Sequence, residues 1–203
     1  MFQIKKGSLK KGSLQIHGFI VSGLFVLLAA ANIPGLSQDK PKPEIIQATA
    51  RGTSTQSGQL IQVRLIINEY STDEDRQILV EAFDQGKNEG LVNALEKMRA
   101  VGRIAIEGTL GYDLSFVRLI PTPTGRKIRF VTNRLLRFGE AYYSTRSVDY
   151  NLTGGELDLN DQDKSKSTGV LYPAAKLSLD KDNELSLDLL QNPWQLVNIS
   201  WGR

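Results

Sequence analysis

Hydrophobic and polar positions alternate with a period of two over much of the chain after residue 43. In 59–70, for example, every odd-numbered position from Ile61 to Ile67 is aliphatic, and Gln62 and Arg64 lie between them. This period predicts strands with one buried face. Similar runs predict strands over 44–55, 59–70, 103–107, 112–120, 127–135, 143–152, 155–159, 169–179, 184–190 and 194–201. Turn-forming residues separate them at 121–125, at Gly154-Gly155, at 161–167 and at 180–183.

The period changes between residues 71 and 100. Ser71 and Glu74 match a capping box, in which a hydroxyl and a carboxylate satisfy unpaired backbone N–H groups at a helix start. Apolar residues at helical spacing follow, and Gly86 is typical of a helix end. A second apolar stripe contains Leu91 and Leu95. The pattern therefore predicts two helices, near 72–85 and 88–100.

Many short strands with one helical insertion indicate an α+β fold. We expect a predominantly antiparallel β sandwich or barrel with a two-helix insertion after the second strand. One β-rich domain would cover 44–203, after a Pro-stiffened linker at 38–43. Trp194 and Trp201 are seven residues apart, so in a regular strand they would face opposite sides, one in the core and one at a rim or edge.

Residues 1–37 have the three parts of a secretory signal peptide. Four lysines precede an apolar run over 18–31, and Pro34 and small residues follow it. The run is shorter than the roughly 20 residues that span a bilayer. Export to a periplasmic or extracellular space is therefore predicted, with cleavage after Ser37 or, alternatively, after Ala31. An uncleaved amino-terminal anchor is the other possibility, and it would be the protein's contact with a membrane.

Composition and charge exclude several kinds of chemistry. The chain has no Cys, and its single His17 lies in the signal segment, so the mature chain cannot use His- or Cys-dependent catalysis. The net charge of +3 becomes −1 when the four signal lysines are removed. An exported chain of that charge does not have the electrostatic character of a nucleic-acid-binding protein. We expect no cofactor and no metal site. The 161–167 loop alternates oxygen-bearing residues but departs from a calcium-loop pattern.

Charge is polarised within the mature chain. Residues 99–146 carry a net charge of +6, and residues 147–190 carry −5. Because arginine suits contacts with carboxylates and phosphates, the basic stretch is a candidate ligand site. The residues chosen for it are Arg103, Arg118, Arg129 and Tyr112. The alternative is that basic strands pair with acidic neighbours, which needs no ligand.

A second function class uses carboxylates alone. A glycan hydrolase needs two carboxylates about 5–10 Å apart across a cleft. The candidates lie in or beside predicted strands: Glu69, Glu107, Asp113, Glu140, Asp149, Glu156 and Asp188. Their alternation with apolar residues is equally typical of a solvated strand face.

Three stretches, 68–76, 91–95 and 101–104, carry a family resemblance. They read NEYSTDEDR, LVNAL and VGRI, and they resemble small exported bacterial proteins that are uncharacterised. The resemblance implies a periplasmic or secreted setting and transfers no site residue. The sequence thus favours an exported, non-enzymatic binding or interaction module with an anionic or amphipathic ligand. Its partner would be a small molecule, lipid, glycan or envelope protein, and a carboxylate hydrolase or a structural envelope protein are the alternatives.

Overall fold

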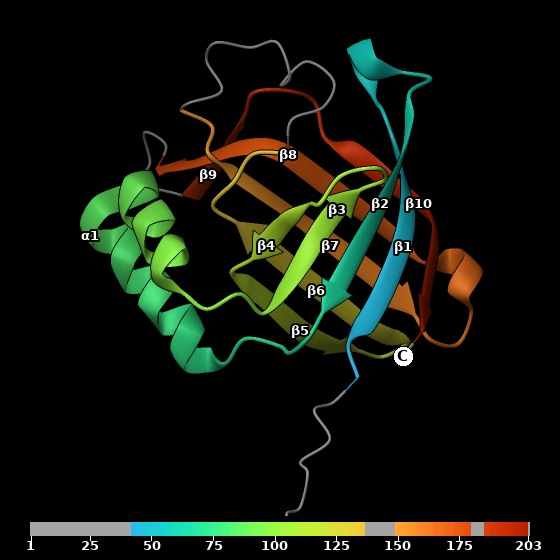
Figure 1. Cartoon of the computed structure of the whole chain (residues 1–203), viewed down its shortest axis with the longest axis horizontal. Coiled ribbons are helices and arrows are strands. Elements are labelled where there is room, and N and C mark those ends of the chain that lie inside the picture. The colour runs from blue at the N-terminus through green and yellow to red at the C-terminus, as the bar shows by residue number, and fades with distance from the viewer. Residues whose placement is uncertain (1–41, 137–148, 180–184, 203) are drawn as a thin grey trace, which may run out of the picture. The chain divides into compact units, whose positions relative to one another are not determined.

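The computed structural model describes residues 42–136, 149–179 and 185–202, in which ten antiparallel strands form one sheet (Figure 1). The strands are β1 (Glu44–Arg51), β2 (Leu60–Ile67), β3 (Gly102–Ile106), β4 (Tyr112–Leu114), β5 (Phe116–Thr122), β6 (Gly125–Thr132), β7 (Leu152–Asn160), β8 (Thr168–Leu179), β9 (Leu185–Leu189) and β10 (Trp194–Gly202). Their order is β4-β3-β2-β1-β10-β8-β7-β6-β5, and β9 pairs with β8. The sheet curls into a nearly closed barrel, which confirms the predominantly antiparallel β architecture.

The interior of the barrel is filled by the apolar positions that alternation predicted. On β2, Val63, Leu65 and Ile67 are at most 2% exposed, whereas Arg64 between them is exposed. Alternate residues of the other strands complete one contiguous core, and they include Ile46, Ile104, Ile128, Leu157, Leu171 and Trp194. The barrel is therefore a packed core built from both halves of the sheet.

The expected pair of helices is not confirmed, because one helix, α1 (Asp73–Lys97), occupies both predicted segments. Its helical backbone is nevertheless interrupted where the break was predicted: Lys87, directly after Gly86, adopts non-helical angles (φ 50°, ψ −139°), and the helix resumes after this bend. The bend brings the two halves together so closely that a Cβ at Gly90 would lie 2.2 Å from the Ala82 carbonyl oxygen. Glycine at position 90 is thus required by this contact.

Asn88 fixes α1 to the sheet. Its side-chain amide donates to Asn151 Oδ1 at 3.0 Å, and its Oδ1 accepts the Leu177 backbone N–H at 2.8 Å. Apolar residues of α1, among them Leu79 and Leu95, pack in a second cluster with residues of β7 and β8. The hydrogen bonds of Asn88 and this apolar cluster therefore both hold α1 against the sheet. No helix in the described ranges is long and apolar enough to cross a membrane.

The helix begins one residue later than predicted. Thr72 is the N-cap, its side chain accepting from the Asp75 N–H at 3.2 Å, and Asp75 Oδ2 accepts the Thr72 N–H at 2.8 Å. The capping box is therefore Thr72 and Asp75 instead of Ser71 and Glu74. Ser71 is bonded to β5 and is not available as a cap.

Gly154 and Gly155 were expected to interrupt the sheet, but they lie inside β7. A Cβ at Gly155 would lie 2.4 Å from Cζ of Phe130, so this glycine makes room for an aromatic ring of β6. The expected turn at 121–125 is also shorter than predicted, because Pro121 and Thr122 belong to β5 and Gly125 begins β6.

The two tryptophans face the same side of β10, contrary to expectation. Asn198 has a positive φ of 51°, and the β1–β10 register shifts by one residue beside it. Such a bulge reverses the inward and outward alternation. As a result, Trp194 is fully buried and Trp201 packs against the same core from the end of the strand.

Several predicted features lie outside the described residues. They are the signal peptide at 1–37, most of the linker at 38–43, most of the strand predicted at 143–152, the turn at 180–183, and Glu140.

Candidate functional site

Basic residues of β6 pair with acidic residues of β7. Lys127 Nζ lies 2.7 Å from Glu156 Oε1 and 3.4 Å from Asp158 Oδ2, and Arg129 Nε lies 2.6 Å from Glu156 Oε2. The hydrogen bonds from Lys127 and Arg129 hold the pKa of Glu156 below its usual value. Much of the charge polarity in the sequence is thus satisfied between neighbouring strands, as the cross-strand alternative predicted.

Two of the four predicted ligand-binding residues belong to this paired surface. Arg118 and Arg129 are direct cross-strand partners in the β5–β6 ladder. Two like charges in such positions repel, and each has an acidic neighbour instead. Arg118 Nη2 lies 3.5 Å from Asp73 Oδ1, and Arg129 is paired with Glu156. Neither arginine lines any of the three grooves described below.

The other two predicted residues, Arg103 and Tyr112, come together in one groove. This groove of about 340 Å³ lies between the last turn of α1 and the strands β3 and β4. Arg103 Nη2 donates to Asp113 Oδ1 at 2.9 Å, and its Nη1 donates to the Leu110 carbonyl oxygen at 3.2 Å. Asp113 thereby fixes the guanidinium of Arg103 on the wall of the groove. We call this the Arg103 groove.

Arg134 and Asn133, which follow β6, also line the Arg103 groove. Arg134 is exposed, and no ion pair to it is found within the described part of the chain. Arg134 belongs to the basic stretch 99–146, but it was not among the residues predicted for the ligand site. Only the fold shows that residue 134 lies beside residues 103 and 112.

A larger groove runs along α1. It has a volume of about 650 Å³, and both halves of the bent helix line it. Ile78, Ala82, Ala94, Met98 and Val101 supply apolar walls. We call this the α1 groove. Sequence analysis missed it because it depends on the bend at Lys87, which folds residues 75–86 against residues 90–98.

A third groove lies on the outer face of β1, β2 and β3. It has a volume of about 260 Å³ and is lined mainly by polar residues, among them Gln47, Gln62, Arg64 and Glu107. None of the three grooves is lined by two of the seven carboxylates proposed for hydrolysis: Glu107 lines this one, and Asp113 lines the Arg103 groove. The grooves therefore offer no pair of those carboxylates across a cleft.

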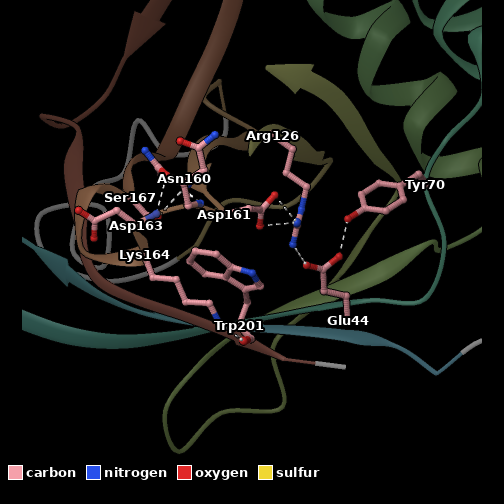
Figure 2. Close-up of polar contacts among 10 residues, drawn as sticks. Glu44, Tyr70, Arg126, Asn160, Asp161, Asp163, Lys164, Ser167 and Trp201 are labelled. Carbon is pink, nitrogen blue, oxygen red and sulfur yellow. Dashed lines mark hydrogen bonds and ion pairs between the residues drawn. The ribbon is translucent and has the colours of Figure 1, made fainter. Parts of the chain in front are cut away.

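An ionic cluster fills one end of the barrel (Figure 2). Arg126 Nη2 lies 2.5 Å from Glu44 Oε1, and its Nη1 lies 2.8 Å from Asp161 Oδ1. Glu44 is 6% exposed, and its other carboxylate oxygen accepts the Tyr70 hydroxyl at 2.7 Å. Burial acts to lower the pKa of Arg126, but the hydrogen bond and charge of Glu44 and the charge of Asp161 outweigh it and raise that pKa. The guanidinium is therefore held charged between two carboxylates.

Trp201 covers this cluster from the side of β10 (Figure 2). Its ring lies 5.9 Å from the Arg126 guanidinium carbon and 4.7 Å from Lys164 Nζ. Both are cation–π distances. Lys164 comes from the 161–167 loop, in which Asp163 accepts hydrogen bonds from Ser165 and Asp161 is bonded to Arg126. Among the described residues no group of three His, Asp or Glu side chains is placed to hold a metal ion.

Comparisons with known proteins add no assignment, since no family model, no curated protein and no solved structure matches the chain.

Proposed function

We propose that the protein is an exported, non-enzymatic binding module and that the Arg103 groove holds an anionic group of its ligand. The observation that carries this proposal is the meeting of Arg103, Tyr112 and Arg134 in one groove. Arg103 is already oriented by Asp113. Arg134 has no such acidic partner within the described ranges, so its guanidinium is the donor that a carboxylate or phosphate of the ligand would meet.

The rest of the groove supports recognition of such a group. Asn133, Ser115 and Tyr112 add neutral hydrogen-bonding side chains to the wall. A few polar groups on a partly apolar wall are typical of small-molecule sites. The filled interior of the barrel also favours a ligand bound on the outside of the sheet.

Export rests on residues 1–37, which combine a lysine-rich start with an apolar run. Fractionation of the producing cells, followed by amino-terminal sequencing, tests it. The expected result is a periplasmic or secreted species that begins at Gln38, or at Asn32 if cleavage follows Ala31. An intact Met1 on a cytoplasmic species would contradict export.

Binding is tested by NMR titration of the full-length chain with butanoate, using butanol as the uncharged probe. We expect butanoate to shift the signals of Tyr112 and Asn133, and butanol not to do so. The Arg134→Gln variant should bind butanoate at least about tenfold more weakly, since a hydrogen bond to a charged group contributes about 1.5–3 kcal/mol.

Arg118→Gln is the matched control, because Arg118 lies on β5 and does not line the groove. It should bind butanoate like the unmodified chain. Equal loss of affinity in both variants, or equal binding of butanol and butanoate, would show that the Arg103 groove does not recognise an anion.

A further inference from the structure

The α1 groove and the Arg103 groove lie on opposite sides of one short segment. Residues near the end of α1 alternate between them: Ala94, Lys97 and Arg99 line the α1 groove, whereas Leu95, Glu96 and Ala100 line the Arg103 groove. Met98 lines both. Methionine is an unbranched, flexible side chain that adapts to what packs on it. The two grooves are therefore neighbours that share one deformable wall.

The α1 groove has the chemistry of a site for a hydrocarbon chain. Its floor includes Gly86 and Gly90, which project no side chain into it, and Ala82 and Ala94 are small. Ile78 lines it and remains 52% exposed, so apolar surface faces water there. The volume of about 650 Å³ is within the range of small-molecule sites. Covering this surface with methylene groups would be favourable.

Charge at the groove identifies the end at which an anionic head group fits. Lys97 and Arg99 line the α1 groove beside Met98, and Arg103 and Arg134 lie beyond it in the Arg103 groove. Asp75, in the first turn of α1, also lines the α1 groove, and the bend at Lys87 folds this turn back towards Lys97, while Arg99 is paired with Glu69. Lys97 and Arg134 are the cations of the two grooves to which the described residues offer no ion pair, so an anionic group fits where the grooves meet.

We propose that the ligand is an anionic single-chain amphiphile, with its carboxylate or phosphate in the Arg103 groove and its hydrocarbon chain passing over Met98 into the α1 groove. This inference rests on the proposed function, because it assigns the head group to the same site. It adds the chemical class of the ligand and a second contact surface that the sequence did not suggest.

The test compares unbranched carboxylates of increasing length, from butanoate to dodecanoate, each below its micelle concentration. Affinity for the full-length chain should rise with each added methylene, by up to about fourfold where the methylene is fully buried, since one buried methylene contributes about 0.8 kcal/mol. Ile78→Asp should abolish this chain-length dependence. Val80→Asp is the matched control, because Val80 is 41% exposed on the same helix and does not line the groove.

A second measurement locates the chain without any variant. A dodecanoate with a nitroxide near its methyl end should broaden the backbone NMR signals of Ala82 and Gly90 and spare those of Gln47 and Gln62 in the third groove. Broadening at those glutamines instead would overturn the proposal.

The outcomes separate the two proposals. If butanoate binding depends on Arg134 but affinity does not rise with chain length, the head-group site stands and the chain site is wrong. Equal effects of Ile78→Asp and Val80→Asp would also overturn the chain site. If no carboxylate binds in an Arg134-dependent way, both proposals fail.

Discussion

Ser71 and Val117 are joined by two hydrogen bonds across the opening of the barrel. The Ser71 backbone N–H donates to the Val117 carbonyl oxygen at 2.7 Å, and the Val117 N–H donates to Ser71 Oγ at 3.1 Å. Ser71 follows β2, and Val117 lies in β5 at the end of the strand order. One serine therefore joins the segment after β2 to β5, which lies at the far end of the strand order.

Ser71→Ala should destabilise the fold by about 1–3 kcal/mol, because the N–H of the fully buried Val117 would lose its acceptor. Chemical denaturation measures the free energy of unfolding. Ser57→Ala, at an exposed turn position, is the control and should change that free energy by less than about 0.5 kcal/mol. Equal midpoints for the two variants would mean that the Ser71 hydroxyl does not stabilise the fold through Val117.

Arg126→Met should cost about 3 kcal/mol, because it leaves the carboxylate of Glu44 buried without its cation. Adding Glu44→Gln should recover part of that loss, since the uncompensated charge is then removed. Arg51→Met, at an exposed arginine that donates to Gln195, should have little effect. Additive losses in the double variant would argue against coupling between Arg126 and Glu44.

Gly155→Ala should destabilise the protein by about 1–3 kcal/mol, because the new methyl would collide with the Phe130 ring. The neighbouring Gly154→Ala is the matched control, since its nearest atom, the Phe130 carbonyl oxygen, would lie at 3.5 Å. Thermal unfolding of both variants compares them directly. Combining Gly155→Ala with Phe130→Leu should cost less than the sum of the two single losses, and a fully additive result would contradict the contact.

Glu156 makes stability depend on acid pH. Its pKa in the folded protein is lowered from the usual 4.5, mainly by hydrogen bonds from Lys127 and Arg129. A lowered folded pKa means that this stabilisation is complete above pH 4.5 and is lost as the pH falls through the folded pKa.

Denaturation midpoints between pH 6 and pH 3 measure this dependence. The Glu156→Gln variant should lose less stability over that range than the unmodified chain, and so should Lys127→Met, which removes the first of the two hydrogen bonds. An unchanged slope in both variants would show that Glu156 is not a source of acid sensitivity.

Alternation along the sequence predicted most of the sheet, because burial of one strand face leaves a period of two. The errors occur where a distant contact decides the local structure. Ser71 was assigned to the helix cap, but β5 takes its hydroxyl. Gly155 predicted a turn between strands, but in the fold it lies inside β7, where the ring of Phe130 from β6 packs against it. No local sequence pattern indicates the bulge at Asn198.

The candidate site was predictable only in part. Arginine-rich composition led to Arg103, and Tyr112 was named with it because it is close in sequence. Arg134 lies about 30 positions away and reaches the same groove through the pairing of β5 and β6. Arg118 and Arg129 have the same composition signal, but register places them against each other and beside carboxylates. Residue type alone could not distinguish an arginine that lines the groove from arginines that pair with carboxylates outside it.

The position of β10 has a consequence for the timing of folding. This last described strand lies between β1 and β8, so it joins a half made of β1–β4 to a half made of β5–β9. A chain that emerges amino end first cannot complete the ladder of strands until Trp194–Gly202 follow, although Ser71 and Asn88 contact the second half independently of β10. The continuous sheet can therefore form only after β10 has been synthesised.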